Sequence, residues 1–406
     1  MSAASFRRLS EISVEGRRVF VRVDMNVPLD HEGKVGDDSR IVASLPTLRY
    51  LIEKGARLVV ASHLGRPKGK PDPKQSLRPV RDALERYLRR KVAFADSAVG
   101  PEAEAASRAL ADGDVLLLEN LRFDPGEEKN DPAYARALAS LGDAYVNDAF
   151  GAAHRAHAST EGITAFVPDC AAGFLLEQEL KALGRLLESP ERPYVAILGG
   201  AKISGKIDVL TNLLPRVDRI VIGGGMMFTF LAAKGIEVGR SLVEKDRVET
   251  ARKLLDDPAA SGKLLLPTDC RVASSVTGED PGRVVLVGSI PPDQAGVDIG
   301  PASIAAIEDA LSEARTIFWN GPMGIFEVPA YAEGTLGVAQ AVAQATRRGA
   351  FTVVGGGDSL AAAHQAGVAS RISHLSTGGG ASLEFLEGKT LPGVLALERA
   401  ARAEAR

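Results

Sequence analysis

Short apolar runs rich in β-branched residues recur along the chain, and the segments between them are long enough to form helices. This spacing is typical of βα units in a mostly parallel sheet. The first half has runs at residues 19–23, 58–61, 115–118 and 144–146, with helices expected at 79–90 and 132–141. The second half has runs at residues 194–198, 219–222, 264–266, 316–319, 351–354 and 372–375. The pattern predicts an α/β protein with two Rossmann-like domains, each a mostly parallel sheet flanked by helices.

The segment between the two sets of runs has the character of a connecting helix. Residues 173–188 carry apolar side chains at helical spacing, and Pro190 and Pro193 follow them. This predicts a hinge helix at 173–190 between an N-terminal domain at 1–172 and a C-terminal domain at 191–390. A turn at Leu391-Pro392-Gly393 leaves a tail at 391–406. The sequence leaves open whether this tail packs on the N-terminal domain.

The composition of the chain limits which ligands it can bind and in which compartment it can work. With a formal net charge of −3 over 406 residues, the chain has no global positive field to hold nucleic acid. Charges in the first twenty residues interrupt the apolar core that a secretory signal needs, and the uncharged stretches are too short to span a bilayer. Cys170 and Cys270 form no Cys-x-x-Cys pair, which fits a reducing compartment. We therefore expect a cytoplasmic monomer that binds neither nucleic acid nor membrane.

Glycine clusters follow five of the strands predicted in the second half. They are Gly199-Gly200, Gly223-Gly224-Gly225, Gly321 with Gly324, Gly355-Gly356-Gly357 and Gly378-Gly379-Gly380. Glycine lets the backbone approach a ligand closely, and amides at a helix N-terminus attract phosphate. A single cluster is an ordinary turn, but five at equivalent strand ends, where ligands of open α/β sheets collect, favour phosphate binding.

Two nucleotide-binding fingerprints are incomplete in this chain. A Gly-x-Gly-x-x-Gly pattern does not follow the first strand, and Ile207 stands where a Walker A loop needs Ser or Thr for magnesium. Lys202 and Lys206 would share one face if a helix begins there. Their place after a buried strand and two glycines favours phosphate contact over a solvated role.

Two acidic residues of the second half remain ambiguous from spacing. Asp358 follows three glycines and precedes Ser359, so it could cap the next helix or supply one oxygen to magnesium. Glu327 could be a surface acid or could accept hydrogen bonds from ribose hydroxyls.

The strand ends of the first half carry polar side chains rich in arginine and histidine. They are Asp24, Asn26, Arg40, His63, Arg66, Glu119, Asn120, Arg122, Asn147, Asp148, His154, Arg155 and His157. Because guanidinium forks bind carboxylate and phosphate, four arginines converging on one edge predict a site for a small, multiply anionic molecule. The three histidines could form a metal site instead, but the surrounding arginines would repel a cation.

Taken in order, these segments resemble the phosphoglycerate kinase family along nearly the whole chain. The matching segments are Arg22-Val-Asp-Met-Asn-Val-Pro28, Ser62-His-Leu-Gly-Arg-Pro67, Glu119-Asn-Leu-Arg-Phe123, Val146-Asn-Asp-Ala-Phe-Gly151, His154-Arg-Ala-His157, Gly199-Gly-Ala-Lys202, Gly223-Gly-Gly-Met226, Trp319-Asn-Gly-Pro322, Gly355-Gly-Gly-Asp-Ser359 and Ser376-Thr-Gly-Gly-Gly-Ala-Ser382.

The resemblance implies roles for individual residues. It implies that 3-phosphoglycerate or its 1-phosphorylated form binds the N-terminal domain through Asp24, Asn26, Arg40, His63, Arg66, Arg122 and Arg155. It implies that Mg²⁺ with ADP or ATP is held by Lys206, Gly223, Gly224, Glu327, Gly356, Gly357, Asp358 and Ser359, with Asp358 toward the metal. The groups implied to meet the transferring phosphoryl group are Arg40, Lys202 and the helix N-termini at Gly357 and Gly379.

The reaction implied is reversible phosphoryl transfer from 1,3-bisphosphoglycerate to ADP, giving 3-phosphoglycerate and ATP in glycolysis and gluconeogenesis. A carboxylate with a pKa of about 4 is already ionised at neutral pH, so no general base is expected. Hinge closure is expected to bring the substrates together and to exclude water. A nucleotide-dependent binding protein is the non-enzymatic alternative, against which Arg40, Lys202 and Asp358 argue. A dehydrogenase is disfavoured by the missing glycine fingerprint.

Overall fold

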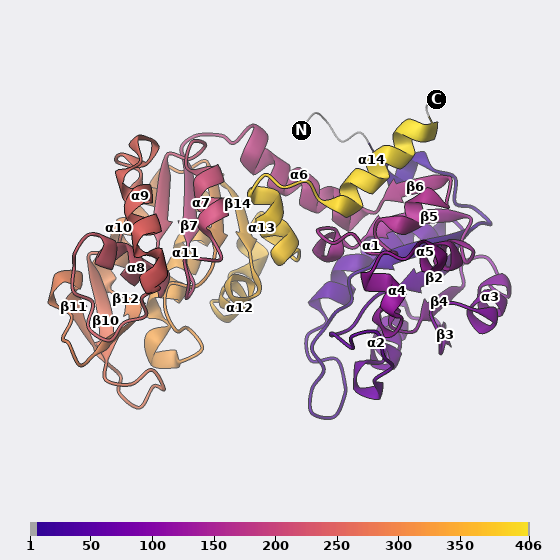
Figure 1. Ribbon diagram of the computed structural model, residues 1–406, viewed down its shortest axis with the longest axis horizontal. Helices are drawn as coiled ribbons and strands as arrows, with labels where there is room; N and C mark the ends of the chain where they lie inside the picture. The colour runs from indigo at the N-terminus through magenta and orange to yellow at the C-terminus, as the bar shows by residue number, and fades with distance from the viewer. Residues whose placement is uncertain (1–5, 405–406) are drawn as a thin grey trace. The chain divides into compact units, whose positions relative to one another are not determined.

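The computed structural model describes residues 6–404, which form two compact units (Figure 1). The first unit runs to Lys181 and resumes at Thr390, and the second unit is Ala182–Lys389. Residues 1–5 of the expected N-terminal domain and 405–406 of the expected tail lie outside the described residues.

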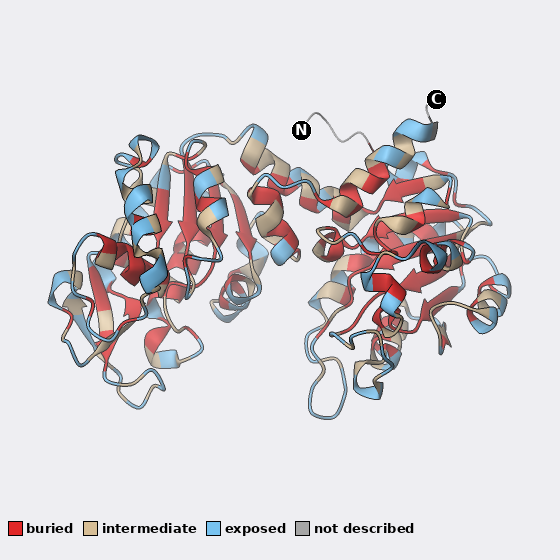
Figure 2. Ribbon diagram, viewed as in Figure 1, coloured by how far each residue is buried: buried red, intermediate tan, exposed pale blue. Residues whose placement is uncertain are grey.

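The first unit is built on a six-stranded sheet with the order β3-β4-β2-β1-β5-β6, in which all neighbours are parallel. The strands are β1 (Arg18–Val23), β2 (Arg57–Ala61), β3 (Val92–Ala95), β4 (Val115–Leu118), β5 (Ala144–Asp148) and β6 (Asp169–Ala172). Every residue of β1 after Arg18 is buried, and Figure 2 shows the central strands in the buried colour. Burial on both faces explains why these strands read as continuous apolar runs.

Helices alternate with the strands of the first unit. They are α1 (Ser39–Glu53), α2 (Arg78–Leu88), α3 (Pro101–Arg108), α4 (Pro125–Glu128), α5 (Pro132–Ala139), α6 (Phe174–Glu188) and α14 (Pro392–Glu404). Local sequence sets several of the starts: the Asp131 carboxylate accepts hydrogen bonds from the amides of Ala133 and Tyr134, and Pro132 is the first residue of α5. Apolar side chains of α1 such as Ile41 and Leu48 pack into one core with the strands.

The second unit repeats the arrangement with a parallel six-stranded sheet of order β15-β14-β13-β7-β8-β9. Its strands are β7 (Tyr194–Leu198), β8 (Arg219–Ile222), β9 (Leu264–Leu265), β13 (Thr316–Asn320), β14 (Phe351–Gly355) and β15 (His374–Ser376). Its helices are α7 (Ile207–Leu213), α8 (Met226–Ala233), α9 (Val248–Asp256), α10 (Pro301–Ser312), α11 (Glu333–Arg347), α12 (Gly357–Gln365) and α13 (Gly380–Leu386). The α/β fold class predicted from the sequence is confirmed.

The sequence pattern missed several strands. The second unit also holds a small antiparallel sheet of order β11-β10-β12, formed by β10 (Asp269–Ala273), β11 (Arg283–Leu286) and β12 (Ala295–Ile299). Its β11 is largely exposed and β12 contains Gly296 and Asp298, so neither is a continuous apolar run. In the first unit, the missed β3 and β6 are the two edge strands, and β6 is made of Asp, Cys and Ala.

The last helix packs within the first unit. α14 contacts β6 and the short 3₁₀ helix η5 (Gly162–Ala165). The amide of Gly393 donates to the carbonyl of Ala153 at 2.9 Å, and Arg399 pairs with Glu161 at 3.5 Å. The division between the two units falls inside α6, between Lys181 and Ala182. No helix among residues 6–404 combines the length and apolar character that a membrane span requires.

Candidate active site

The polar residues predicted for the first unit come together at one edge of its sheet. Asp24 follows β1, His63 lies two residues after β2, and Arg122 lies in the 3₁₀ helix η3 (Leu121–Phe123) after β4. Because β1, β2 and β4 are consecutive parallel neighbours in the sheet, their carboxyl ends share an edge. We call Asp24, Asn26, Arg40, His63, Arg122 and Arg155 the arginine site.

Direct contacts tie the arginine site together. Arg40, in the first turn of α1, pairs with Asp24 at 2.6 Å and keeps 30% of its side chain exposed. The peptide around Gly65 is held from both sides, because its amide donates to Asn26 Oδ1 and its carbonyl accepts from the Arg122 guanidinium, each at 2.8 Å. A ligand at this edge would therefore meet groups that are already fixed in position.

The arginine site has a strongly positive electrostatic environment. Burial, followed by the charges of Arg22, Arg122, Arg40 and Arg155, holds the pKa of His63 well below its usual range. Burial and the neighbouring charge of Arg155 also lower the pKa of Arg122 to about 10. Such crowding of positive charge without enough carboxylates to balance it favours an anionic ligand.

Two of the predicted arginines are less firmly held. Arg155 donates from Nε to the Nε2 of His154 at 3.1 Å, and its charge acts on His63 and Arg122, so it belongs to the arginine site. Arg66 follows the anchored Gly65, but its own side chain is exposed and makes no ion pair within residues 6–404. The structure thus brings six of the seven predicted side chains into contact or charge range, and leaves Arg66 beside them.

Beneath the arginine site lies a buried group that the sequence analysis did not single out. Arg22 in β1, Glu127 in α4 and Ser159 are each fully buried and are joined by hydrogen bonds. A charged residue in the middle of the run Val21-Arg22-Val23 was a usable signal for Arg22. Glu127 gave none, because it lies in a polar stretch that resembles a surface turn.

In the second unit, the glycine loops gather where the strand order reverses. The chain passes from β7 outward to β8 and β9, and later from β13 outward to β14 and β15, so the reversal lies between β7 and β13. There the amide of Gly199 donates to the carbonyl of Asn320 at 2.9 Å, and the amide of Gly200 donates to that of Pro322 at 2.8 Å. Ligands of open α/β sheets bind at such a switch point.

The close approach of these loops requires glycine at specific positions. A Cβ added to Gly321, whose φ is +98°, would lie 2.4 Å from the carbonyl oxygen of Gly199. A Cβ added to Gly224, whose φ is +64°, would lie 2.5 Å from the amide nitrogen of Gly200. Both positions therefore exclude side chains for conformational and steric reasons, which lets the main chains of these loops approach closely at the switch point.

Lys206 reaches into the same switch point. Its ammonium donates to the backbone carbonyl of Asn320 at 2.8 Å and to that residue's side-chain oxygen at 2.5 Å. Burial lowers the pKa of Lys206 to about 8, and the nearby charge of Asp358 opposes the shift. A partly buried ammonium that is balanced mainly by dipoles is suited to an incoming anion.

The start of α12 differs from one expectation. The capping role considered for Asp358 is wrong, because the N-cap is Gly356 and Asp358 lies one residue inside the helix with an exposed carboxylate. The φ of +90° at Gly356 turns the chain into the helix before Asp358 is reached. Ser359 is buried, and its hydroxyl accepts a hydrogen bond from the amide of Gly321 at 2.5 Å. Ser359 thus links α12 to the loop after β13.

Lys202 and Lys206 do not share a helix face, which corrects another expectation. α7 begins at Ile207, with Lys206 as the N-cap residue and Lys202 in the preceding loop. That loop is held by Glu244, which accepts from the hydroxyl of Ser204 at 2.6 Å and from its amide at 3.1 Å. Lys202 itself is exposed.

Two further predicted positions lie at the periphery. Gly379 is the N-cap of α13 with a φ of +53°, as expected for a residue at that helix start. Glu327 is exposed on the loop after β13, and within the described residues it makes no hydrogen bond or ion pair. Geometry alone therefore gives Glu327 no partner.

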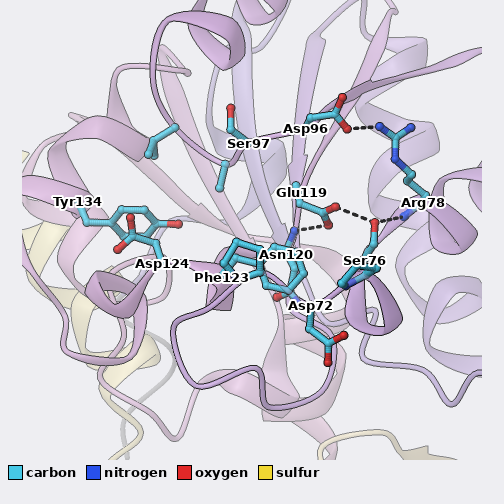
Figure 3. A pocket seen from close by; sticks show the side chains of 14 residues that line it. Asp72, Ser76, Arg78, Asp96, Ser97, Glu119, Asn120, Phe123, Asp124 and Tyr134 are labelled. Carbon is cyan, nitrogen blue, oxygen red and sulfur yellow. Dashed lines mark hydrogen bonds and ion pairs between the residues drawn. The ribbon is translucent and has the colours of Figure 1, made fainter.

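A separate cavity of about 600 Å³ lies at the carboxyl ends of β3 and β4 and is drawn in Figure 3. Glu119 and Asn120 line it, but none of the residues expected to bind substrate, nucleotide or metal does. Its acids are used internally: Glu119 accepts from the hydroxyl of Ser76 at 2.6 Å, and Asp96 pairs with Arg78. With acidic residues outnumbering its single arginine, this cavity has the wrong charge for an anionic substrate.

Comparison with known proteins gives one consistent family. The family model for phosphoglycerate kinase matches residues 9–389. The phosphoglycerate kinase of Prosthecochloris aestuarii is 55% identical over 392 residues, which cover 96% of this chain and 99% of that protein. The phosphoglycerate kinase of Chlorobium chlorochromatii is 56% identical with the same coverage.

Solved structures agree with the sequence relatives. The phosphoglycerate kinase of Coxiella burnetii is similar with a TM-score of 0.87 at 40% identity, covering 98% of this chain and 100% of that one. The enzyme of Pyrococcus horikoshii gives a TM-score of 0.86 at 34% identity, with the same coverage.

Proposed function

This chain belongs to the phosphoglycerate kinase family, and from that premise we propose how its individual residues carry out the reaction. It is a phosphotransferase with a carboxyl group as acceptor and has phosphoglycerate kinase activity, in glycolysis. We further propose a role for each site residue, a bound metal ion, a domain motion and an oligomeric state.

We assign phosphoglycerate binding to the arginine site together with Arg66. The observation that carries the assignment is the gathering of Asp24, Arg40, His63 and Arg122 at one sheet edge, with positive charge in excess. Guanidinium groups bind carboxylate and phosphate oxygens in paired hydrogen bonds, so a small molecule with both groups fits this edge. Asp24 and Asn26 would accept and donate hydrogen bonds to the substrate hydroxyl.

We assign nucleotide binding to the second unit. Lys206, Gly223, Gly224 and the Gly356–Ser359 loop would hold the phosphates, and Glu327 would accept from the ribose hydroxyls. The assignment is supported by the two glycine positions where a side chain would collide with backbone and by the partly buried ammonium of Lys206. The domains are thus proposed as 1–172 for phosphoglycerate and 191–390 for nucleotide, joined by the hinge at 173–190.

The donor set of this loop fits magnesium bound with the nucleotide. Among residues 6–404, no group of three or more His, Cys, Asp and Glu side chains is arranged to hold a metal ion. Magnesium in kinases is bound by one or two carboxylates together with phosphate oxygens and water, so the single exposed Asp358 beside Lys206 is sufficient. When bound, the ion would neutralise charge on the nucleotide phosphates.

The transfer step needs positioning and charge stabilisation more than proton transfer. Because the acceptor carboxylate is already ionised, no residue has to act as a base. Negative charge on the three equatorial oxygens of the transferring group would be met by Arg40, by Lys202 and by amides at the helix starts near Gly357 and Gly379. Their contribution is electrostatic.

We also propose that the two units close on each other during catalysis, with α6 as the hinge. An acyl phosphate is readily hydrolysed, so exclusion of water protects it. Small-angle scattering should show a smaller radius of gyration when phosphoglycerate and MgATP are added together than with either alone. An unchanged radius with both substrates would refute the closure.

Binding measurements on two matched sets of variants test the residue assignments. His63→Gln and Arg122→Ala should each raise the Kd of 3-phosphoglycerate at least about tenfold and leave the Kd of MgADP unchanged, since each loses a substrate contact. Lys206→Met should do the reverse. Arg57→Ala is the control, because Arg57 begins β2, the strand that ends beside His63, and pairs with Asp112 at the opposite edge. Equal loss of both affinities in every variant would contradict the assignment.

We also propose that the protein is located in the cytoplasm and is a monomer. Both cysteines are buried and are not joined in a disulfide, which is compatible with a reducing compartment. Light scattering coupled to size exclusion should give a mass near 42.7 kDa. A mass of twice that value would overturn the monomer.

A further inference from the structure

A buried chain of hydrogen bonds runs beneath the arginine site and connects three segments that are distant in sequence. The Nε of Arg22 donates to Ser159 Oγ at 2.7 Å, and Ser159 Oγ donates to Glu127 Oε1 at 2.6 Å. The amide of Ser159 donates to the other oxygen of Glu127 at 3.0 Å. All three side chains have no measurable exposure.

The direction of these hydrogen bonds follows from the number of available protons. A serine hydroxyl has one proton, and an arginine has donors only. Since Ser159 accepts from Arg22, its own proton is free to go to Glu127. Both oxygens of Glu127 are then filled by donors, which is the arrangement of an ionised carboxylate. Glu127 is thus the buried negative charge that compensates Arg22.

This arrangement aims the other end of the Arg22 guanidinium at His63. One terminal nitrogen of Arg22 lies 3.1 Å from His63 Nδ1. Because arginine cannot accept a hydrogen bond, Nδ1 must be the acceptor and the imidazole proton must be on Nε2. The contact therefore selects one tautomer of a neutral histidine.

The groups that face His63 all act in the same direction. They are Arg22 from β1, Arg40 from α1, Arg122 from η3 and Arg155 from the segment after β5. Burial raises the pKa of Glu127, while the charges of Arg22 and Arg122 and the two hydrogen bonds from Ser159 oppose that rise. His157 Nδ1 is 3.8 Å from Glu127, too far for a hydrogen bond, so it does not compete with Ser159.

We propose that Glu127, acting through Ser159 and Arg22, is a positioning residue that holds His63 as the Nε2-protonated tautomer, ready to donate to an anionic oxygen of phosphoglycerate. The inference rests on the proposed function of the arginine site. It adds a role for a glutamate that does not itself belong to that site. Glu127→Gln keeps the size of the side chain but removes the charge, and its single oxygen replaces only one of the two carboxylate oxygens that accept from Ser159. Arg22 then loses its counter-charge and one of the contacts that orient it, and it keeps the hydrogen bond from its other terminal nitrogen to the Val23 carbonyl.

The test is the tautomer of His63, read from the ring nitrogens in long-range ¹H–¹⁵N spectra of histidine-labelled protein. The chain has six histidines, and His63→Gln assigns the signal. In the wild type we expect the pattern of Nε2–H, and we expect that signal to move when 3-phosphoglycerate is added. In Glu127→Gln and in Ser159→Ala we expect a mixture of the Nδ1–H and Nε2–H tautomers of the neutral ring.

The kinetic consequence separates positioning from general destabilisation. Both variants should raise the KM for 3-phosphoglycerate by about tenfold, the effect of losing one charge-assisted hydrogen bond, while the KM for ATP stays within about twofold. Ser107→Ala is the matched control, because Ser107 is also a buried serine of the first unit but bonds only to its own helix at Glu104. It should leave the tautomer and both KM values unchanged.

The possible outcomes are distinct. If Glu127→Gln does not fold, Ser159→Ala decides the question, because it keeps both charges and breaks only the connection. A His63 that remains Nε2-protonated in the folded variants, with an unchanged KM, overturns the proposal. A wild-type His63 signal that ignores 3-phosphoglycerate would instead overturn the assignment of His63 to the substrate site, whatever its tautomer.

Discussion

In the first unit the groups proposed to bind phosphoglycerate are side chains, and a buried network fixes them. In the second unit the nucleotide is proposed to bind at glycine loops that cross closely at the switch point, together with Lys206. Arg40 is held by Asp24 at 2.6 Å, whereas Gly200 is held by a backbone bond to Pro322 at 2.8 Å. Both arrangements collect anions at the carboxyl ends of parallel strands.

The difference matters for how each site can fail. A side-chain site is sensitive to loss of charge or of a hydrogen-bond partner, even when the shape is kept. The glycine loops are in addition sensitive to added bulk, because a Cβ at Gly321 or Gly224 would collide with backbone. Substitutions that add volume at these glycines should therefore distinguish the second unit from the first.

The largest effect is expected for Arg40→Ala in the first unit. Loss of a positioned donor to the transferring group should lower kcat about a hundredfold or more, measured in a coupled assay of ATP formation. Arg18→Ala is the control, because Arg18 pairs with Asp143 at 2.6 Å at the start of β1, away from the carboxyl edge. A near-normal kcat in Arg40→Ala would show that Arg40 does not stabilise the transferring phosphoryl group.

Added bulk should be the main weakness of the second unit. Gly321→Ala forces a residue with a side chain into a φ of +98° and against the Gly199 carbonyl, so the free energy of unfolding should fall by roughly 2 to 4 kcal/mol. Trp319, the only tryptophan, reports this unit through its fluorescence in urea. Gly288→Ala, where nothing lies within 4 Å and φ is not positive, should be neutral. Equal free energies of unfolding for Gly321→Ala and Gly288→Ala would show that the loops shift to accommodate the added Cβ.

Two buried groups, one in each unit, should give pH dependences of opposite sign. Burial and the charges of Arg122 and Arg22 lower the pKa of His157 from 6.5 to about 3. The unfolded chain then takes up a proton first as the pH falls, so stability is full above pH 6.5 and is lost toward pH 3. The slope is about 1.4 kcal/mol per pH unit for this one group.

Asp298 of the second unit provides the contrast. Burial raises its pKa from 3.8 to about 7, so its contribution is full below pH 3.8 and is lost as the pH rises toward 7. Urea unfolding followed by circular dichroism at several pH values should therefore change slope in one direction for His157→Gln and in the other for Asp298→Asn, each relative to the wild type. Slopes of the same sign would show that one of the two groups is not buried in the folded protein.

The smallest effect is expected for the loop that carries Lys202. Burial pushes the pKa of Glu244 upward, but hydrogen bonds from Ser204 and the amide of Ile203 and the charge of Lys202 outweigh it and lower that pKa. Glu244→Gln should weaken this tether and reduce kcat by about threefold, in keeping with a partly exposed ion contact. Glu249→Gln, which alters only the exposed pair with Arg252, is the control. A kcat that matches the control would mean that the loop is held by other contacts.

Much of the fold was predictable because its signals are local. The strands β4 and β7 are continuous apolar runs, and β1 and β8 are mostly apolar, since both faces of a parallel sheet are buried. The edge strand β6 and the exposed β11 were missed for the converse reason, because their residues are small, polar or solvent-facing. Their strand conformation depends on the neighbours with which they pair.

The candidate site divides in the same way. The positions of Asp24, His63 and Arg122 at one edge of the sheet could be predicted, because each follows a strand whose end can be recognised in the sequence. The capping role considered for Asp358 is wrong, because the N-cap of α12 is Gly356. The condition for a shared face of Lys202 and Lys206 is not met, because α7 begins at Ile207. Glu244 holds the loop before α7 through Ser204. Glu244 is 40 positions from Ser204, beyond the reach of local patterns.

By itself, then, the amino-acid sequence determined the two parallel sheets and the membership of the phosphoglycerate kinase family. It also determined that the strand ends of the first unit are rich in basic residues and those of the second unit in glycine. Tertiary structure alone decided that Ser159 lies between Arg22, 137 positions away, and Glu127, 32 positions away. The physical reason is range: side-chain alternation and turn chemistry act over a few residues. A buried charge, by contrast, must find its partner wherever folding brings one within hydrogen-bond distance.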